Sequence, residues 1–393
     1  MLDLIGRKEE LFINDIKKHN EHLCSVIESS SFLVIGSAGS IGQSVTKEIF
    51  KRNPKKLHCV DISENNLVEL VRDLRSSYGY IKGDFRTFAL DIGSDEFYKM
   101  YDFHGKYDFV LNLSALKHVR SESDPFTLLR MIDVNILNTE KTIIKCIEDE
   151  TSKYFCVSTD KAANPVNMMG ASKRIMENFL YYYCSKIDIS TARFANVAFS
   201  DGSLLSGFNQ RLMKNQPIAA PSDVKRYFLT PKESGELCLL SCILGETGDI
   251  YFPKLNEELN LITFSEIARN FLKSKGYETY ECKSEEEARN RVNELAIKRK
   301  WPCYFSESST TGEKDYEEFF VDGEKLDMNK FFGIGIVKKD ISYDLSSLEE
   351  FKDRLHEIKK KDIVEKKEIV ELFRSCLPYF NHIEKGKYLD EKM

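Results

Sequence analysis

The chain has 393 residues, of which 42% are hydrophobic and 31% are charged, and its formal net charge at pH 7 is −6. This composition is typical of a soluble globular protein that is long enough for one large domain or two lobes. The acidic balance excludes the broad basic surface that nucleic-acid binding usually needs, so the expected partners are small anionic metabolites rather than nucleic acid.

The first 30 residues predict an N-terminal helical extension. Charged and apolar residues recur at helical spacing in "MLDLIGRKEELFINDIKKHNEHL", without the continuous apolar run of a signal peptide or membrane span. We therefore expect a cytoplasmic protein with no membrane partner.

The ten cysteines favour a reducing compartment, because they contain no C-x-x-C pair that would suggest a zinc cage or a disulfide framework. Cys238 and Cys242 lie four residues apart in a helical pattern, and we interpret them as buried core thiols rather than ligands. No metal is predicted.

Residues 31–195 predict a doubly wound, Rossmann-type α/β domain with a parallel sheet. Short runs rich in β-branched and aromatic residues alternate with longer helical patterns. The expected strands are "FLVIG", "KLHCVD", "FRTFALD", "YDFVLNLSA", "KYFCVSTD" and "DISTARF". Such alternation is typical of a sheet that helices cover on both faces.

A dinucleotide site is predicted at the first turn between a strand and a helix. Gly36, Gly39 and Gly42 permit a tight turn, a close approach of the backbone to a pyrophosphate, and close packing of helix on strand. A plain strand-helix turn is the alternative for such a triplet. A P-loop is excluded because G-K-[ST] is missing. The same predicted cofactor site includes Ser37, Ser40 and Ile41.

The next strand ends in Asp61, whose carboxylate can accept hydrogen bonds from an adenosine ribose and would repel a 2'-phosphate. NAD is therefore favoured over NADP as the cofactor. Asp61 could instead cap the following helix, a role that Ser63 fills equally well.

Residues 196–393 predict a smaller substrate-binding lobe followed by a C-terminal extension, with some segments returning to the sheet. Gly, Ser and Pro interrupt short amphipathic segments at its start. Charged helices are expected over residues 284–300 and 359–375.

The stretch "STDKAANPVNMMGASKR" connects the predicted domain with a known family. Thr159 and Lys173 lie where extended short-chain dehydrogenases/reductases carry their Ser/Thr and Lys, whereas Met169 stands at the position of their usual tyrosine. The combination of S-T-D-K, N-P-x-N and M-G-A-S-K resembles the configuration-retaining nucleotide-sugar 4,6-dehydratases acting on UDP-N-acetylglucosamine, in which methionine at this position is usual.

The resemblance covers most of residues 30–240, through "NLSALKHVR", "RFANVAFSDGSLLSGFNQRL" and "RYFLTPKESGEL". Residues 301–320 look like the C-terminal part of soluble members linked to legionaminic acid or bacillosamine-type sugars.

The resemblance implies an acid-base pair in place of the tyrosine. Asp160 would protonate the departing C6 hydroxyl of the sugar, Lys161 would remove the C5 proton, and Thr159 would bind the C4 oxygen. Lys173 would hold the nicotinamide ribose. For Lys161 to act as a base, its pKa must be lowered by burial or by a nearby cation such as Lys173.

The remaining residues carried over from the family are contacts. Asp91, with its neighbour Ile92, resembles the adenine contact, although an exposed helix cap is a nearly equal alternative. Ala115 and Lys117 lie where the family lines the cofactor and the sugar. The predicted substrate-binding residues are Lys117, His118, Asn196, Ser203, Arg211 and Arg226. His118 could simply pack, and either arginine could form a surface ion pair instead.

Two other functions compete with the dehydratase interpretation. A nucleotide-sugar 4-epimerase shares the fold but has no use for the Asp160–Lys161 pair, and a non-catalytic NAD-binding sensor would not need Thr159 and Lys173. A GDP-linked sugar is the alternative substrate. A homo-oligomer, at least a dimer, is expected from the relatives.

Overall fold

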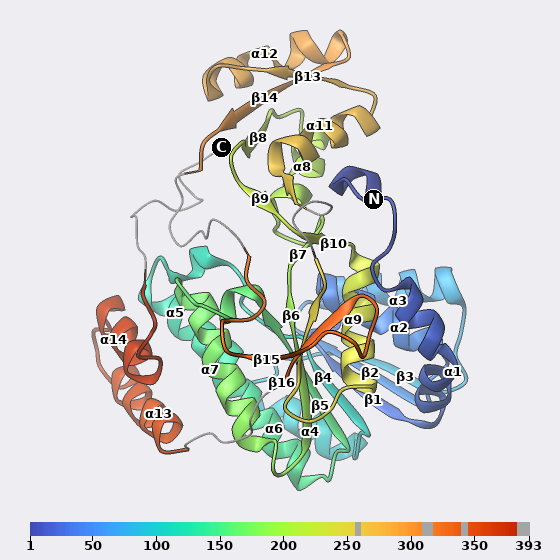
Figure 1. Cartoon of the computed structure of the whole chain (residues 1–393), viewed down its shortest axis with the longest axis vertical. Helices are drawn as coiled ribbons and strands as arrows, with labels where there is room; N and C mark the ends of the chain where they lie inside the picture. The colour runs from blue at the N-terminus through green and yellow to red at the C-terminus, as the bar shows by residue number, and fades with distance from the viewer. Residues whose placement is uncertain (256–260, 309–316, 339–344, 383–393) are drawn as a thin grey trace.

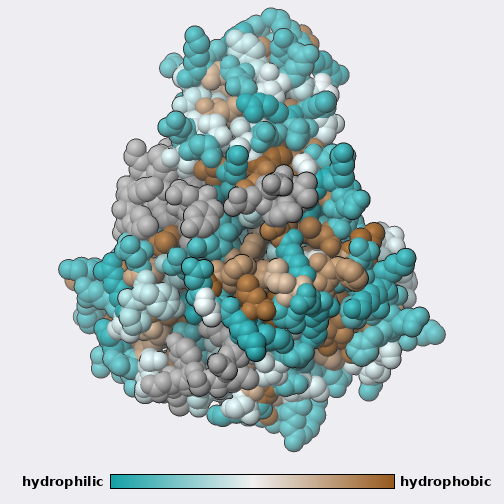
Figure 2. Space-filling view, viewed as in Figure 1, coloured by the Kyte–Doolittle hydropathy of each residue, from teal (hydrophilic) through white to brown (hydrophobic). Residues whose placement is uncertain are grey.

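The computed structural model describes residues 1–255, 261–308, 317–338 and 345–382. A large sheet domain lies below a smaller lobe in Figure 1. Hydrophobic residues gather around the middle of the molecule, whereas the tip of the small lobe is mainly hydrophilic (Figure 2).

The sheet domain is built on a nine-stranded sheet with the order β15-β16-β11-β6-β5-β4-β1-β2-β3. Strands β1 to β6 and β11 pair in parallel, and β16 and β15 add an antiparallel edge. The strand bounds are β1 (Ser31–Ile35), β2 (Lys56–Asp61), β3 (Asp84–Ala89), β4 (Phe109–Asn112), β5 (Lys153–Thr159), β6 (Asp188–Phe194), β11 (Ile250–Pro253), β15 (Lys325–Asp327) and β16 (Ile334–Lys338). All six strands expected from the sequence lie in this sheet, and the Rossmann-type α/β fold is confirmed.

Helices cover both faces, which is why β1 is buried along its whole length. One face packs against α1 (Ile13–Ser29), α2 (Ser40–Phe50), α3 (Glu64–Tyr78) and α9 (Pro231–Ile243). The other packs against α4 (Asp95–His104), α5 (Pro125–Ile132), α6 (Asn138–Glu148), α7 (Met168–Tyr183), α13 (Leu345–Lys359) and α14 (Lys366–Cys376). Cys238 and Cys242 of α9 are buried in this core as free thiols, as the sequence predicts.

The N-terminal 30 residues contact both parts of the molecule. Ile5, in a short 3-10 helix (Leu2–Ile5), packs in the core of the small lobe, and α1 packs against α9 of the sheet domain. Between them, Arg7 forms a buried ion pair with Glu233, which also closes the capping box at the start of α9. The helical extension is therefore a connection between the two parts.

The small lobe has a three-stranded sheet, β13-β14-β8, packed against three helices. Its elements are α8 (Leu204–Met213), β8 (Ile218–Pro221), α11 (Phe264–Ser274), β13 (Glu278–Glu281), α12 (Glu285–Ile297) and β14 (Lys300–Ser306). The short pairs β7 (Asn196–Val197) with β10 (Phe228–Leu229), and β9 (Lys225–Arg226) with β12 (Ile262–Thr263), lie near its junction with the sheet domain.

Both expected charged helices exist with different limits. The helix predicted over 284–300 ends at Ile297, because Trp301 and Cys303 are buried as part of strand β14. The helix predicted over 359–375 is α14, which begins at Lys366 after a break from α13. Both C-terminal helices pack on α7, so this part of residues 196–393 belongs to the sheet domain, as do α9, β11, β15 and β16.

Within the described ranges, no helix combines the length and the apolar composition that crossing a bilayer requires.

Candidate active site

The turn between β1 and α2 has the geometry that glycine alone permits. Gly36 has φ +73°, and a Cβ added there would lie 2.7 Å from the backbone nitrogen of Ser114. A Cβ on Gly42 would lie 2.0 Å from the carbonyl oxygen of Gly36. The turn therefore folds back tightly against the first turn of α2, whose N-terminal N–H groups are available to an anion.

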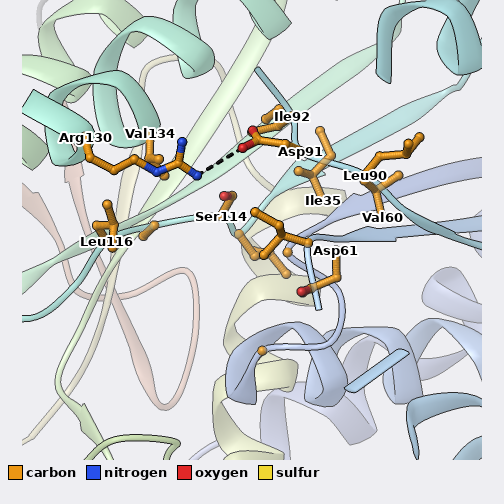
Figure 3. A pocket seen from close by; sticks show the side chains of 15 residues that line it. Ile35, Val60, Asp61, Leu90, Asp91, Ile92, Ser114, Leu116, Arg130 and Val134 are labelled. Atoms are coloured by element: carbon orange, nitrogen blue, oxygen red, sulfur yellow. Dashed lines mark hydrogen bonds and ion pairs between the residues drawn. The ribbon is translucent and has the colours of Figure 1, made fainter. Parts of the chain in front are cut away.

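A cavity of about 250 Å³ opens at the carboxyl ends of β1 to β4, next to this turn. Figure 3 shows its side chains, with Arg130 and Asp91 in contact and Asp61 lying apart from them. The predicted cofactor residues that line it are Gly36, Gly39, Asp61, Asp91, Ile92 and Ala115.

Five other residues predicted for the cofactor site do not line this cavity, namely Ser37, Ser40, Ile41, Gly42 and Lys173. The amide and hydroxyl of Ser37 both donate to the carbonyl of Val60, which turns this side chain into the protein. The hydroxyl of Ser40 accepts a hydrogen bond from the N–H of Asp201, and Ile41 packs against the core. Gly42 lets the first turn of α2 lie close to the backbone of Gly36.

Asp61 supports the glycine turn. Its Oδ2 accepts a hydrogen bond from the N–H of Ala38 at 2.9 Å, and its Oδ1 accepts one from the N–H of Ser63 at 2.9 Å. Ser63 is the residue that caps α3. Asp61 thus lines the cavity and braces the glycine turn, while Ser63 and not Asp61 caps the following helix.

Asp91 forms an ion pair with Arg130 of α5, with 3.0 Å between Oδ2 and Nη2. Burial acts to raise the pKa of Asp91, but the N–H of Gly93 and the guanidinium of Arg130 outweigh it and hold the pKa below its ordinary value. The sequence did not single out Arg130, because its helix carries no motif.

The loop after β4 is held by Asn135, another residue that sequence reasoning missed. Asn135 lies in a π-helical turn (Asp133–Leu137) between α5 and α6. Its amide accepts from the N–H of Leu116 and donates to the carbonyl of Leu116 and the hydroxyl of Ser172 on α7. Wide turns of this kind are frequent at functional sites. Here the turn fixes the cavity wall to the helix that carries Met169 and Lys173.

Thr159, Asp160 and Lys161 meet where β5 ends. The hydroxyl of Thr159 donates to Oδ1 of Asp160 at 2.7 Å, and the ammonium of Lys161 donates to Oδ1 and Oδ2 at 3.1 and 3.2 Å. The side chain of Asp160 is 3% exposed and that of Lys161 is 26% exposed. The predicted acid and base are therefore a hydrogen-bonded ion pair at the carboxyl edge of the sheet.

The expectation that surroundings lower the pKa of Lys161 is wrong. Burial acts to lower the pKa of this lysine, but the negative charges of Asp160 and Glu317 outweigh burial, and the pKa lies above its ordinary value. The nearby cation that opposes them is Arg226. Lys173 instead donates to the carbonyl of Val157 at 3.0 Å.

Glu317 is the functional candidate that the sequence did not reveal. The amide of Asn196 donates to its Oε1 at 2.5 Å, and the N–H of Tyr227 donates to its Oε2 at 2.8 Å. Arg226, a buried residue of β9, acts electrostatically on both Glu317 and Lys161. The structure thus joins Asn196 to Glu317 and brings Arg226 close enough to act electrostatically on Lys161. Nothing in "EKDYEEFF" distinguishes this glutamate from its acidic neighbours.

Helix α7 carries Met169 and Lys173 with buried side chains, and burial lowers the pKa of Lys173. Met169 is 4% exposed and belongs to the core beneath the sheet. A Cβ on Gly170 would lie 2.5 Å from the carbonyl oxygen of Lys161, so this glycine lets the turn after β5 lie against the helix.

The other predicted substrate residues lie in loops and on α8. Lys117 and His118 follow β4, and the ring of His118 lies against Gly202, where an added Cβ would be 2.9 Å from the imidazole. Ser203 caps α8 through its hydroxyl, and Arg211 lies in the last turn of that helix. The substrate-binding roles of these four residues remain predictions.

The fold and this cluster define a Rossmann-type α/β protein with a hydrogen-bonded Asp–Lys ion pair at the carboxyl end of β5. A family model described as polysaccharide biosynthesis protein matches residues 32–338. The chain therefore belongs to the polysaccharide biosynthesis protein family.

Three curated relatives illustrate the range of this similarity. An uncharacterized membrane protein of Methanocaldococcus jannaschii is 29% identical over 81% of this chain and 88% of the relative. The probable polysaccharide biosynthesis protein EpsC of Bacillus subtilis is 26% identical over 92% of this chain, but the match spans only 55% of EpsC. A UDP-glucose 4-epimerase of Rickettsia typhi is 26% identical over 75% of this chain and 87% of the epimerase.

Solved structures show the same fold. Pen from Bacillus thuringiensis has a TM-score of 0.64 at 20% identity, over 89% of this chain and 98% of Pen. The dTDP-glucose 4,6-dehydratase DesIV from Streptomyces venezuelae, solved with NAD and TYD bound, has a TM-score of 0.55 at 17% identity, over 74% of this chain and 88% of DesIV.

Proposed function

We propose that this protein is an NAD-dependent nucleotide-sugar 4,6-dehydratase that acts on UDP-N-acetylglucosamine and forms UDP-2-acetamido-2,6-dideoxy-α-D-xylo-hexos-4-ulose. The observation that carries the proposal is the Asp160–Lys161 pair, which joins an acid and a base through hydrogen bonds at the end of β5. An elimination of water needs both groups in one place, one at C5 and one at the C6 hydroxyl.

The residues of the cavity fit NAD as the cofactor. Gly36 and Gly42 keep the turn free of side chains, and the N-terminus of α2 suits a pyrophosphate. Asp61 lines the cavity and would accept a hydrogen bond from a ribose hydroxyl. Lys173 would hold the nicotinamide ribose. Bound NAD would supply the acceptor and donor of the hydride, and a ketone at C4 makes the C5 proton acidic.

The resting ion pair explains how a lysine with a raised pKa can still act as a base. When the ammonium proton of Lys161 passes along the hydrogen bond to Asp160, Lys161 becomes a free amine and Asp160 becomes a carboxylic acid. Lys161 then takes the C5 proton, and Asp160 gives its proton to the departing C6 hydroxyl, which leaves as water. The pair returns to its resting charges, so one internal proton transfer prepares both groups.

The test is to incubate the purified protein with UDP-N-acetylglucosamine, and separately with GDP-N-acetylglucosamine, in heavy water. We expect loss of one water from the UDP-linked sugar and deuterium at C5 of the product, both measured by mass spectrometry and NMR. Loss of water from the GDP-linked sugar alone would identify that nucleotide instead.

Three results would contradict the dehydratase. A change of configuration at C4 without loss of water would make the protein a 4-epimerase, the function named for the Rickettsia relatives. Binding of NAD without conversion of either sugar would favour a non-catalytic sensor. Net reduction of NAD would indicate a simple oxidation.

We expect Asp61→Ala to weaken NAD binding by about 2–4 kcal/mol, because two hydrogen bonds from the ribose to a charged acceptor would be lost. The same change removes the acceptor of the N–H groups of Ala38 and Ser63, so the free energy of unfolding should also fall. Asp61→Asn is the matched variant, since it keeps one oxygen for Ala38 and removes the charge. Calorimetry with NAD and urea unfolding separate the two effects. Equal NAD affinity in Asp61→Asn and the wild type would limit the carboxylate to supporting the turn.

A further inference from the structure

The side chain of Asn196 is held by a carboxyl group that lies 121 residues further along the chain. The amide nitrogen of Asn196 donates to Oε1 of Glu317 at 2.5 Å, and the N–H of Tyr227 donates to Oε2 at 2.8 Å. Asn196 begins β7, and Tyr227 lies between β9 and β10. Each oxygen of Glu317 therefore has its own N–H donor, and the donors come from two different segments.

The register of the sheet places Asn196 beside the Asp160–Lys161 ion pair. Strands β5 and β6 run in parallel, and Thr159 at the end of β5 pairs with Phe194 at the end of β6. Asn196 follows Phe194 by two residues, just as Lys161 follows Thr159 by two residues. Both segments therefore leave the same edge of the sheet, where the proposed reaction requires the hexose of the substrate to bind.

The segment that carries Glu317 is fixed to the sheet by a fully buried arginine. Arg193 of β6 donates to the carbonyl oxygen of Phe319 at 2.7 Å and binds the carboxylate of Glu177 through two hydrogen bonds. The rings of Phe319 and Tyr227 are also in contact, with 6.4 Å between their centroids. The position of Glu317 relative to Asn196 is therefore set by the core and not by a free loop.

The hydrogen bonds of Glu317 decide which end of the Asn196 amide faces it. Burial raises the pKa of Glu317 to about 8, but both of its oxygens accept from N–H groups, whereas a protonated carboxyl group would have to donate through one of them. A carboxylate only accepts, so the NH2 group of Asn196 must face it and the carbonyl oxygen must face away. Within the part of the chain that the structure describes, no hydrogen bond is donated to this carbonyl oxygen.

We propose that Glu317 is a positioning residue that turns the carbonyl oxygen of Asn196 toward the substrate, so that Asn196 selects a hydrogen-bond donor on the hexose. A hydroxyl group or the N–H of an acetamido group has this chemistry. The oxygens of a diphosphate only accept, so they would find no partner in this carbonyl oxygen. The inference rests on the proposed function, because it takes the ligand to be a nucleotide sugar.

The binding test is calorimetric titration of the NAD-loaded protein with UDP-N-acetylglucosamine and with UDP. In Glu317→Gln the new amide must accept from the N–H of Tyr227, so its NH2 group meets Asn196 and forces that side chain to turn around. The hexose then meets a donor in place of an acceptor. We expect the Kd of UDP-N-acetylglucosamine to rise about 10- to 100-fold, and the Kd of UDP to stay within about twofold of the wild type.

Two results of the titrations would overturn the proposal. Unchanged binding of UDP-N-acetylglucosamine by Glu317→Gln would mean that the NH2 group of Asn196 already faces the hexose. An equal loss for UDP would mean that the effect does not concern the hexose. Glu307→Gln, at an exposed glutamate directly after β14, should keep both affinities.

An exchange of the two groups separates orientation from a loss of structure. Asn196→Asp alone places two carboxylates together and should weaken binding further. In Glu317→Gln combined with Asn196→Asp, the new amide accepts from Tyr227 and donates to the new carboxylate, whose other oxygen faces the hexose. We expect this double variant to bind UDP-N-acetylglucosamine at least about fivefold more tightly than Glu317→Gln does. Binding as weak as that of Glu317→Gln, in a variant that urea unfolding shows to be folded, would overturn the proposal.

A further measurement does not depend on any ligand. In protein labelled with ¹⁵N-asparagine, the NH2 signal of Asn196 is the one that Asn196→Asp removes from the NMR spectrum. Because this group is bonded to a carboxylate, its protons should exchange with water at least about tenfold more slowly in the wild type than in Glu317→Gln. Equal rates would overturn the proposal. If the wild type binds no nucleotide sugar, the proposed function fails, while the exchange rates still decide the orientation of Asn196.

Discussion

Lys161→Ala and Asp160→Asn are each expected to lower kcat of the proposed dehydration by about 10²- to 10⁴-fold, because each removes one half of the acid-base pair. Lys161→Ala leaves Asp160 without the ammonium that donates to both of its oxygens. Asp160→Asn keeps the shape of the side chain but cannot carry the proton to the C6 hydroxyl. Steady-state kinetics with detection of water loss measures both, and binding of NAD should be retained.

Met169→Leu tests whether the residue at the usual tyrosine position takes part in the reaction. The side chain of Met169 is 4% exposed and packs in the core, so leucine should change packing by less than about 1.5 kcal/mol and leave most of the activity. Lys214→Ala, at an exposed lysine after α8, is the control for Lys161→Ala and should leave kcat unchanged. If Met169→Leu proves as damaging as Lys161→Ala while NAD still binds, the thioether takes part in the reaction.

Glu177→Ala is expected to lower the free energy of unfolding by about 3–5 kcal/mol, because it leaves the guanidinium of Arg193 buried without its main counter-charge. Both side chains are fully buried, and Arg193 binds the two carboxylate oxygens at 2.9 and 2.8 Å. Urea unfolding at pH 7 measures the loss. A difference of less than 1 kcal/mol from the wild type would contradict it. Glu28→Ala, at an exposed position of α1, should have little effect.

The same pair predicts a pH dependence. Burial acts to raise the pKa of Glu177, but Arg193 and its hydrogen bonds hold it at about 2 in the folded protein. A folded-state pKa below the unfolded value stabilises the protein at neutral pH, and this contribution is lost as the pH falls from the ordinary glutamate range toward 2. The double variant Glu177→Met with Arg193→Met should lose less stability than Glu177→Ala, since no charge remains buried.

The sequence alone predicted six of the nine strands of the sheet domain. Its six expected strands match β1 to β6, because most of them are covered on both faces and are nearly continuous apolar runs, whereas the edge strand β3 is more polar and exposed. The glycine turn was equally visible, since the backbone approach at Gly36 and Gly42 excludes any other side chain. Adjacent residues such as Thr159, Asp160 and Lys161 must also lie together wherever the chain places them.

Contacts between distant segments were decided only by the tertiary structure. The ion pair of Asp91 with Arg130 joins the loop after β3 to α5, and Asn135 binds the backbone of Leu116, which precedes it by 19 residues. Glu317 acts electrostatically on Asp160 and Lys161, which precede it by more than 150 residues, and no local pattern marks it. Its segment is placed by the carbonyl oxygen of Phe319, a backbone group that every residue possesses.

The charge state of the site was also decided only by the tertiary structure. A sequence shows that an aspartate precedes a lysine, but the pKa of Lys161 depends on burial and on every charge nearby in space. From the sequence, Lys173, twelve residues away, is the cation expected to lower the pKa of Lys161. The structure replaces that cation with the carboxylates of Asp160 and Glu317, and the pKa of Lys161 is raised. Local patterns therefore determined which groups are present, while the tertiary structure decided which of them hold the proton, because electrostatic interactions depend on distance through space and not along the chain.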